Sequence, residues 1–204
     1  MILSAAEAHA RKKAPVEGLL PAIAERWSPR AFTSQPVKSD DLRIILEAAR
    51  WAASSNNEQP WRFFVGLNGT EAYVKIASTL VPFNHAWASS VPVLILPIAA
   101  KNAANRKPNH YALYDLGQAV AQMNIQATAL GLATHSMGGF DRDAARQAFA
   151  LTEDEYQLGA VIALGFQAAP DTLDQPLLER EFAPRERKPL SEIALTALNT
   201  PFLL

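Results

Sequence analysis

The sequence contains no cysteine, so it lacks every kind of site that depends on a cysteine sulfur. Disulfides, thiolate nucleophiles and zinc–sulfur centres are therefore excluded. An excess of charge of one sign is also missing, because 19 basic and 20 acidic residues leave a formal net charge of -1. The net charge consequently gives no reason to expect binding to nucleic acid or to anionic lipid.

Long hydrophobic runs are missing as well. The longest apolar run, from Val91 to Ala100, is far shorter than the roughly 20 residues of a membrane helix, and it contains two prolines. Near the start of the chain, the basic residues follow a short apolar stretch, which is the reverse of a secretory signal. These features predict a soluble, cytoplasmic protein.

The common catalytic motifs are absent from the chain. There is no GxSxG, GxGxxG or GxxxxGK[ST] pattern, so a serine hydrolase, a Rossmann fold and a P-loop are not indicated. No metal site is expected either, because the four histidines lie far apart without ligand spacing: His9, His85, His110 and His135. If the protein is an enzyme, the difficult chemistry belongs to a bound organic cofactor.

What the sequence does contain is typical of one globular domain, with 204 residues of which 49% are hydrophobic. Helix and strand patterns alternate without a strict βαβ rhythm, which favours an α+β fold. Predicted strands are 61–67, 91–99 and 159–166. Two helices are predicted over 17–26 and 115–130. Three more are predicted to begin at the N-cap residues Ser39, Thr70 and Asp141, and another at a capping box formed by Thr152 and Glu155. From Pro170 onward we expect mostly extended chain, with a short helix after Ser191.

The predicted helix from Asp115 to Leu130 is apolar on nearly all sides. One stripe includes Leu116 and Met123, and the opposite side includes Ala121 and Ile125. Such a helix is buried on several sides. It is therefore expected to be a central core helix, and the pattern leaves open whether a second subunit shares it.

Four short segments carry the polar chemistry. They read "RWSPRAF" from Arg26, "AASSNNEQPWRFFV" from Ala52, "HSMGGF" from His135 and "RERKPL" from Arg185. Arginine binds phosphate through two parallel hydrogen bonds, and paired glycines let backbone approach a flat ligand. Taken alone, each segment is better explained as surface charge or an ordinary turn than as a ligand site.

Together and in this order, the four segments resemble those of the FMN-dependent nitroreductase family over nearly the whole chain. The resemblance implies an α+β fold with a central antiparallel or mixed sheet flanked by helices, in an intertwined homodimer. It implies a single domain over 1–204, whose extended C-terminal segment (about 170–204) wraps the partner subunit. It also implies FMN as cofactor, at sites on the dimer interface.

The resemblance assigns site residues position by position. No side chain is assigned a catalytic role, since the flavin carries the chemistry and only the Gly138 backbone N–H lies near its N5 atom. Phe83 and Tyr111 are assigned to the substrate pocket, and no metal ligand is expected. The cofactor-binding residues would be Arg26, Trp27, Ser28, Arg30, Ser54, Ser55, Asn57, Asn84, Met137, Gly138, Gly139, Arg185 and Arg187.

The activity implied is transfer of hydride from NADH or NADPH, through flavin N5, to nitroaromatics or quinones by a ping-pong mechanism. Two alternatives stay open: a flavin-dependent enone or quinone reductase of the same family, and a flavin-binding protein without turnover. The chain departs from some members at Trp87, where they have lysine, and at Ala53, where they have proline. The short 100–112 segment lacks a helical insertion that supplies an aromatic lid, so the acceptor preference is open.

Overall fold

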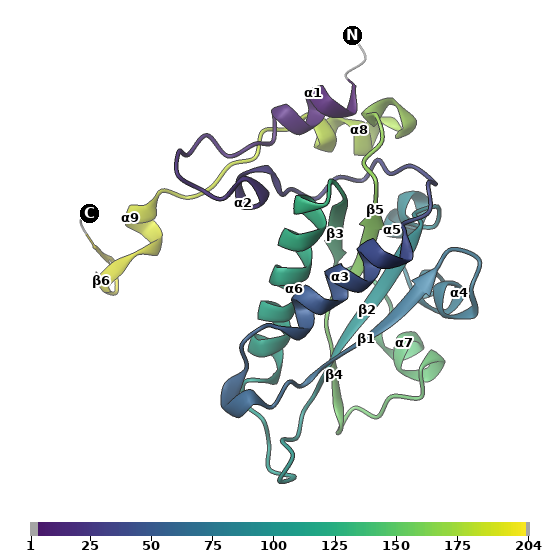
Figure 1. The fold of residues 1–204 in the computed structure, drawn as a ribbon, viewed down its shortest axis with the longest axis vertical. Helices are drawn as coiled ribbons and strands as arrows, with labels where there is room; N and C mark the ends of the chain where they lie inside the picture. Colours follow the sequence, from purple (N-terminus) through teal and green to yellow (C-terminus); the bar gives the residue numbers. More distant parts are fainter. Residues whose placement is uncertain (1–3, 203–204) are drawn as a thin grey trace.

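The computed structural model describes residues 4–202, so the two ends of the predicted 1–204 domain lie outside the described part. Its centre is a five-stranded sheet in which every strand pair is antiparallel. The path runs β1 (Trp61–Leu67), β2 (Val93–Ala100), β5 (Val161–Gly165) and β3 (Ala133–Met137), and β4 (Tyr156–Leu158) also pairs with β2 (Figure 1).

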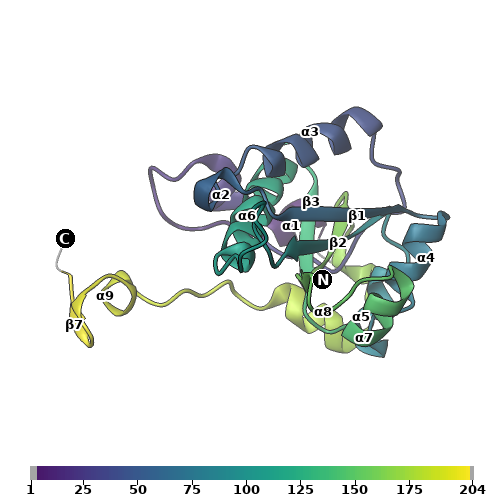
Figure 2. The same ribbon diagram turned by 90° about the horizontal axis from the view of Figure 1, so that it is seen from below.

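Helices cover both faces of this sheet. One face packs against α3 (Ser39–Arg50) and α6 (Ala112–Ala129), and the other packs against α4 (Glu71–Ala77), α5 (Pro82–Ala88) and α7 (Arg142–Ala148) (Figure 2). Residues of β2 alternate between the two cores, because successive strand side chains point to opposite faces. The α+β architecture predicted from the sequence is therefore confirmed.

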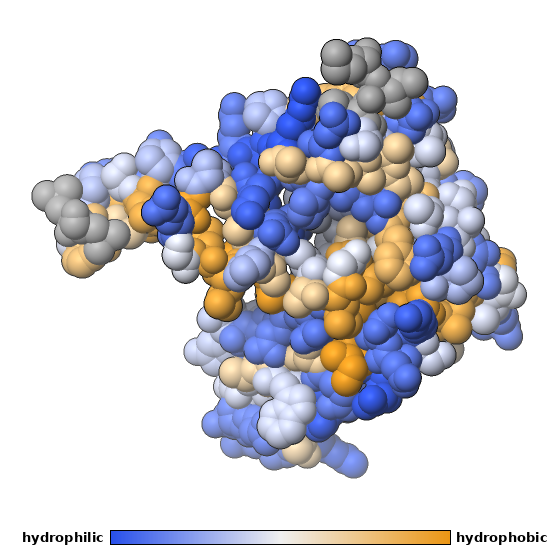
Figure 3. Space-filling view, turned by 45° about the horizontal axis from the view of Figure 1, so that its top comes forward, coloured by the Kyte–Doolittle hydropathy of each residue, from blue (hydrophilic) through white to orange (hydrophobic). Residues whose placement is uncertain are grey.

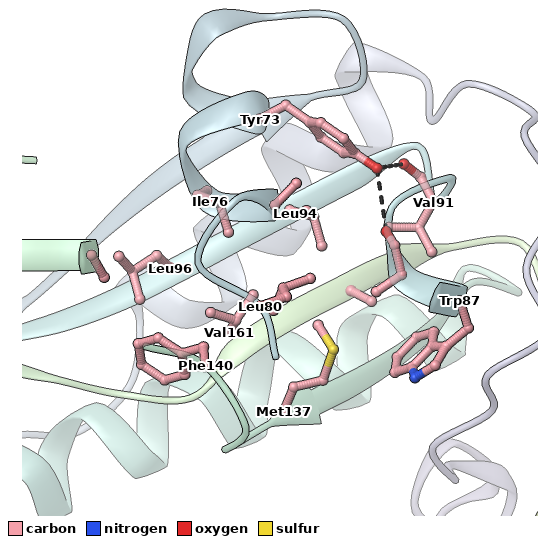
Figure 4. Packing of buried hydrophobic residues seen from close by; sticks show 14 of the residues in the cluster. Tyr73, Ile76, Leu80, Trp87, Val91, Leu94, Leu96, Met137, Phe140 and Val161 are labelled. Atoms are coloured by element: carbon pink, nitrogen blue, oxygen red, sulfur yellow. Dashed lines mark hydrogen bonds between the residues drawn. The ribbon is translucent and has the colours of Figure 1, made fainter. Parts of the chain in front are cut away.

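The core on the α4 side shows how β2 alternates. Leu94 and Leu96 are buried in it (Figure 4). Ile95, between them, is buried in the other core, which contains residues of α3 and α6. The Tyr73 hydroxyl donates a hydrogen bond to the Val91 carbonyl at 2.8 Å, which fixes the start of β2 beneath α4. Burial raises the pKa of Tyr73 to about 12, so this hydroxyl keeps its proton as a donor.

From the sequence, the prolines of the predicted strand 91–99 are expected near its ends or at an edge. Pro97 instead lies inside the central strand β2. Pro97 falls between the residues of β2 that pair with β5 and those that pair with β4. Its missing N–H is therefore not needed by either neighbour. Its carbonyl still accepts the Gly159 N–H at 2.8 Å, so the strand changes partner without an unpaired donor.

The chain ends form a separate group at one end of the sheet. The helices α1 (Ala5–Ala10), α2 (Pro21–Glu25) and α8 (Gln175–Phe182) lie there, and η2 (Pro170–Thr172) precedes α8. Beyond α8 the chain runs away from the body as an extended segment that carries α9 (Leu190–Ile193) and the β6–β7 hairpin (Leu195–Ala197, Thr200–Pro201) (Figures 1 and 2). We call residues 184–202 the C-terminal arm.

Several element predictions are confirmed, because their local signals are strong. Strand β1 has the predicted bounds, Thr70 caps α4, and the Asp141 carboxylate accepts two N–H groups at the start of α7. Gly131 follows α6 with a φ of 76°, as expected for the glycine that ends a helix.

Other predictions are wrong. Ser39 is the first residue of α3 rather than its N-cap, a position that Lys38 takes. Thr152 and Glu155 do bond at 2.7 Å, but the pair closes a turn before β4 and no helix follows. The first predicted helix is shortened to α2, and α6 begins three residues earlier than expected. The sequence did not predict β3, β4, α5 or α8, and α8 shows that the tail is not mostly extended before the C-terminal arm.

Between residues 4 and 202, no helix is both long and apolar enough to cross a membrane. Within the same range, no group of three or more histidine, aspartate or glutamate side chains is placed to hold a metal ion.

Gly66 provides a test of the packing between β1 and α4. A Cβ atom at this position would lie 2.5 Å from the backbone N and Cα of Tyr73, and rigid backbone cannot move aside at low cost. We expect Gly66→Ala to lower the free energy of unfolding by about 2–3 kcal/mol in urea denaturation. Leu67→Ala, at the neighbouring exposed position, is the control and should change it by less than about 1 kcal/mol. Equal stability of the two variants would contradict this packing.

Candidate functional site

Two basic segments that lie far apart in the sequence meet beside α2. The Arg185 guanidinium donates hydrogen bonds to the carbonyl oxygens of Ala24, at 2.8 Å, and of Arg26. The Arg26 side chain in turn donates to the Ser28 hydroxyl at 3.3 Å. Together with Arg187 these residues line a cavity of about 290 Å³, which also includes Trp27 and Arg180. The predicted meeting of the first and last basic segments is therefore present in the structure.

Five basic residues line this cavity, against one acidic residue, Glu186. Among the described residues, no Asp or Glu oxygen lies within 4.0 Å of the guanidinium groups of Arg26, Arg185 or Arg187. Burial lowers the pKa of Arg26, and the charges of Arg185 and Arg187 lower it further. Neighbouring cations that repel one another are stabilised by a bound anion, and guanidinium groups match phosphate in geometry.

Trp27 forms the inner wall of this region rather than an exposed contact. It is buried, and its indole N–H donates to His9 Nδ1 at 3.3 Å. The Lys12 ammonium lies 5.1 Å from the centre of the indole ring and donates to the carbonyls of Arg180 and Ala183 at the end of α8. The N-terminal helix and α8 are thereby tied to the segment that carries Arg26.

Arg30, on the same segment, is turned toward α8. Its backbone N–H donates to the buried carboxylate of Glu181 at 2.8 Å, and its guanidinium lies 3.8 Å from the same oxygen. Arg30 also lines a small cavity of about 160 Å³ with Ala86 and Trp87 of α5. Burial lowers the pKa of Arg30, and Glu181 opposes that effect.

The glycine pair after β3 packs against α5. The Asn84 side-chain amide donates to the Gly139 carbonyl at 2.9 Å, which fixes this loop. A Cβ atom added at Gly138 would meet nothing within 4 Å, so the backbone here faces open space. The Met137 side chain points into the hydrophobic core, so only its backbone can face that space (Figure 4).

The two predicted substrate-pocket residues lie apart. The ring of Phe83, on α5, is 42% exposed and stacks on the guanidinium of Arg180 at 5.0 Å, which connects α5 to the basic cluster. Tyr111 is 59% exposed and directly precedes α6, next to the Ser54 segment rather than near Phe83.

The polar segment from Ser54 forms a short, internally bonded turn, η1 (Ser55–Asn57). Asn56 and Asn57 adopt positive φ angles of 51° and 57°, which asparagine tolerates better than most residues. The Ser54 hydroxyl accepts the Gln59 N–H at 3.0 Å. The Ser55 N–H donates to Asp115, a buried carboxylate in the first turn of α6, at 3.1 Å.

Within one chain, this turn cannot share a small ligand with the basic cluster. The turn is anchored to Asp115 at the start of α6, whereas Arg26 and Trp27 line a cavity with Gly131, just beyond the end of α6. At 1.5 Å per residue these two ends of the helix are about 24 Å apart. The Ser54 segment and the basic cluster therefore lie at opposite ends of α6.

The comparisons with known proteins agree with this fold. The family model described as "Nitroreductase family" matches residues 23–93 and 75–166. An uncharacterized 15.4 kDa protein of Mycolicibacterium smegmatis is 34% identical over 143 residues, which is 66% of this chain and 95% of that protein.

Two solved structures are similar over nearly the whole chain. The crystal structure of an oxidoreductase containing FMN has a TM-score of 0.84 and 30% identity, and the match covers 94% of this chain and 97% of that one. A structure from Desulfovibrio desulfuricans in complex with FMN has a TM-score of 0.72 and 27% identity over 92% and 99% of the two chains. The fold is that of nitroreductase-family oxidoreductases. The chain belongs to the nitroreductase family.

Four residues that position the site were missed from the sequence: Lys12, Asp115, Arg180 and Glu181. Lys12, Arg180 and Glu181 lie in or against α8, a helix that was not predicted. Asp115 appeared only as the first residue of a predicted helix. Its position as a charged residue in an otherwise apolar helix was the one feature of the sequence that could have indicated its role.

His135 gives the site a pH-dependent test. Its Nδ1 lies 2.9 Å from the Pro29 carbonyl and its ring packs on Trp87, and burial lowers its pKa from the usual 6.5 to about 4. Between pH 6.5 and 4 the unfolded chain binds a proton at this position that the folded chain does not, so stability falls as the pH falls. We expect wild type to lose about 3 kcal/mol through this group over that range.

Measuring the free energy of unfolding of wild type and His135→Gln between pH 7 and pH 4 checks this expectation. The variant should show a shallower loss, and His85→Gln, at an exposed position on α5, should retain the wild-type slope. Parallel pH profiles for wild type and His135→Gln would contradict the buried neutral imidazole.

Proposed function

We propose that this protein is an FMN-dependent oxidoreductase that takes electrons from NADH or NADPH and passes them to electron-poor acceptors such as nitroaromatics and quinones. The observation that supports this proposal most directly is the cluster of Arg26, Arg185 and Arg187 without a carboxylate partner among the described residues. Dependence on a reduced nicotinamide also favours a cytoplasmic location.

The residues present fit FMN in three respects. The basic cluster and the Ser28 hydroxyl match a phosphate, which accepts several charge-assisted hydrogen bonds. The open space at Gly138 allows a flat ring to approach the backbone and accept its N–H. Asn84 is held beside that space by its bond to Gly139, at the place where a polar ring edge would lie.

When bound, FMN supplies hydride acceptance and donation at N5, in two half-reactions that share one cleft. In this proposal, Arg26, Ser28 and Arg187 bind the phosphate end, while Arg185 holds the two basic segments together. Arg30 provides positive charge at the pyrimidine edge of the flavin, which favours its reduced form. No side-chain acid or base is assigned, because solvent can supply the proton that accompanies each hydride.

A homodimer completes the site in this proposal. Ser54, Ser55 and Asn57 lie at the Asp115 end of α6, about 24 Å along the helix from the end that lies beside the basic cluster of their own chain. A second chain can bring its own Ser54 segment to the first chain's cluster, because a twofold axis places opposite ends of paired helices together. Each of two FMN sites would then contain residues of both chains.

The surface supports such an assembly. The outer side of α6 exposes Tyr114 at 69% and leaves Gly117 and Ala121 uncovered, so another helix can approach closely. The C-terminal arm exposes Leu190, Ile193 and Leu198, the last at 87%. Hydrophobic surface is visible both on the arm and on the body in Figure 3. We propose that the arm wraps the partner subunit and that α6 pairs with its copy.

Flavin reduction tests the function. Purified protein loaded with FMN should bleach under anaerobic conditions on addition of NADH or NADPH, and its colour should return when a quinone or a nitroarene is added. Arg26→Ala and Arg187→Ala should each weaken FMN binding about 10- to 100-fold, the effect of losing a hydrogen bond to a charged group. Lys75→Ala on α4 is the control and should leave FMN affinity unchanged.

Failure to bind FMN would contradict the proposal as a whole. Binding of FMN without bleaching by either nicotinamide would instead indicate a flavin-binding protein without turnover.

The dimer has a separate test. Ala121→Glu places a charge on the uncovered side of α6, where burial against a second helix would be unfavourable. We expect the variant to run as a folded monomer in light scattering, while Gln147→Glu on α7, on the other side of the sheet, remains dimeric. A wild-type protein that is monomeric at all concentrations would contradict the shared site.

A further inference from the structure

Glu181 carries a carboxylate that is fully buried, and burying a charged group costs free energy. Its side chain is 0% exposed, and one oxygen accepts the Arg30 N–H at 2.8 Å and lies 3.8 Å from the Arg30 guanidinium. The other oxygen has no hydrogen-bond partner among the described residues. Burial raises the pKa of Glu181, whereas the N–H and the charge of Arg30, and the charge of Lys12, oppose that rise.

Packing alone does not explain this residue. An apolar side chain of similar volume would fill the same space in α8 without the cost of burying a charge. The carboxylate is also not required to hold α8, because Lys12 already caps the end of that helix through the carbonyls of Arg180 and Ala183. The specific contacts of Glu181 are those with the backbone N–H and the guanidinium of Arg30.

Arg30 lies between the segment that carries Arg26 and α5. It lies two residues from Ser28 and lines the small cavity beside Trp87, on the helix that also carries Asn84. Its Nε atom is buried without a hydrogen-bond partner among the described residues, and its guanidinium forms one ion pair there, with Glu181. Any change at Glu181 therefore changes both the position of Arg30 and the net charge around it.

We propose that Glu181 is a positioning residue that holds Arg30 at the flavin edge and limits the positive charge presented there, thereby setting the relative affinity for oxidised and reduced FMN. The inference rests on the proposed function, since it requires FMN beside Arg30. Reduced FMN carries more negative charge at that edge than oxidised FMN, so uncompensated Arg30 favours the reduced form. Glu181 shifts the balance back toward the oxidised form.

The test measures FMN binding rather than turnover. Dissociation constants for oxidised and for reduced FMN are determined anaerobically with flavin-free wild type and Glu181→Gln. Without the Glu181 charge, the Arg30 guanidinium acts on the flavin edge uncompensated, which should raise the preference for reduced FMN on the order of tenfold. A tenfold change in this ratio corresponds to a potential that is about 30 mV higher for a two-electron couple.

Three further variants make the test specific. Glu179→Gln, an exposed position on the same helix, should leave the ratio unchanged. Arg30→Gln should move the ratio in the opposite direction, toward oxidised FMN. In the Arg30→Gln background, Glu181→Gln should have much less effect than in wild type, because coupled residues are not additive.

The outcomes separate the two proposals. If wild type binds neither form of FMN, the proposed function fails. If wild type binds FMN but Glu181→Gln has the wild-type ratio, or the same effect with and without Arg30, the role of Glu181 is overturned. Should Glu181→Gln not fold, Arg30→Gln alone decides, and an unchanged ratio there overturns the inference equally.

Discussion

The contact on which the site depends is the pair of hydrogen bonds from Arg185 to the carbonyls of Ala24 and Arg26. It joins segments 159 residues apart and leaves Arg187 exposed beside the Arg26 side chain. Because carbonyl oxygens rather than carboxylates satisfy Arg185, the cluster keeps its positive charge. An anion can therefore lower the free energy of the folded chain by binding there.

Helix α6 determines the distance between the two halves of the site. Its buried side packs against α3 and the sheet, which fixes Asp115 at one end and the Arg26 region at the other. A rigid helix of 18 residues cannot bring its two ends to one ligand. The same helix has an uncovered outer side, so the feature that separates the two groups also offers the surface on which a second chain would reunite them.

Predictions from the sequence were right where a local residue pattern specified one element, or where several motifs together specified the family. The β-branched and aromatic residues of 61–67 specified β1, and the combination of four polar segments predicted the family. Predictions failed where tertiary contacts decide: β3 is short, and β4 gains its strand conformation from pairing with Ile98 and its neighbours. Helix α8 contains only one buried apolar residue, Leu177, so the sequence has no periodic pattern of apolar residues that would predict a helix there. The role of Glu181 was missed for the same reason.

The measurement that tests the shared site most directly is complementation between subunits. One chain carries Arg26→Ala and Arg187→Ala, and the other carries Ser54→Ala and Asn57→Ala. Neither variant alone should hold FMN. Random pairing should restore FMN binding to about a quarter of the wild-type level, since half of the dimers are mixed and each mixed dimer has one intact site. No recovery in the mixture, or full FMN binding by the Ser54→Ala and Asn57→Ala chain alone, would contradict a site built from two chains.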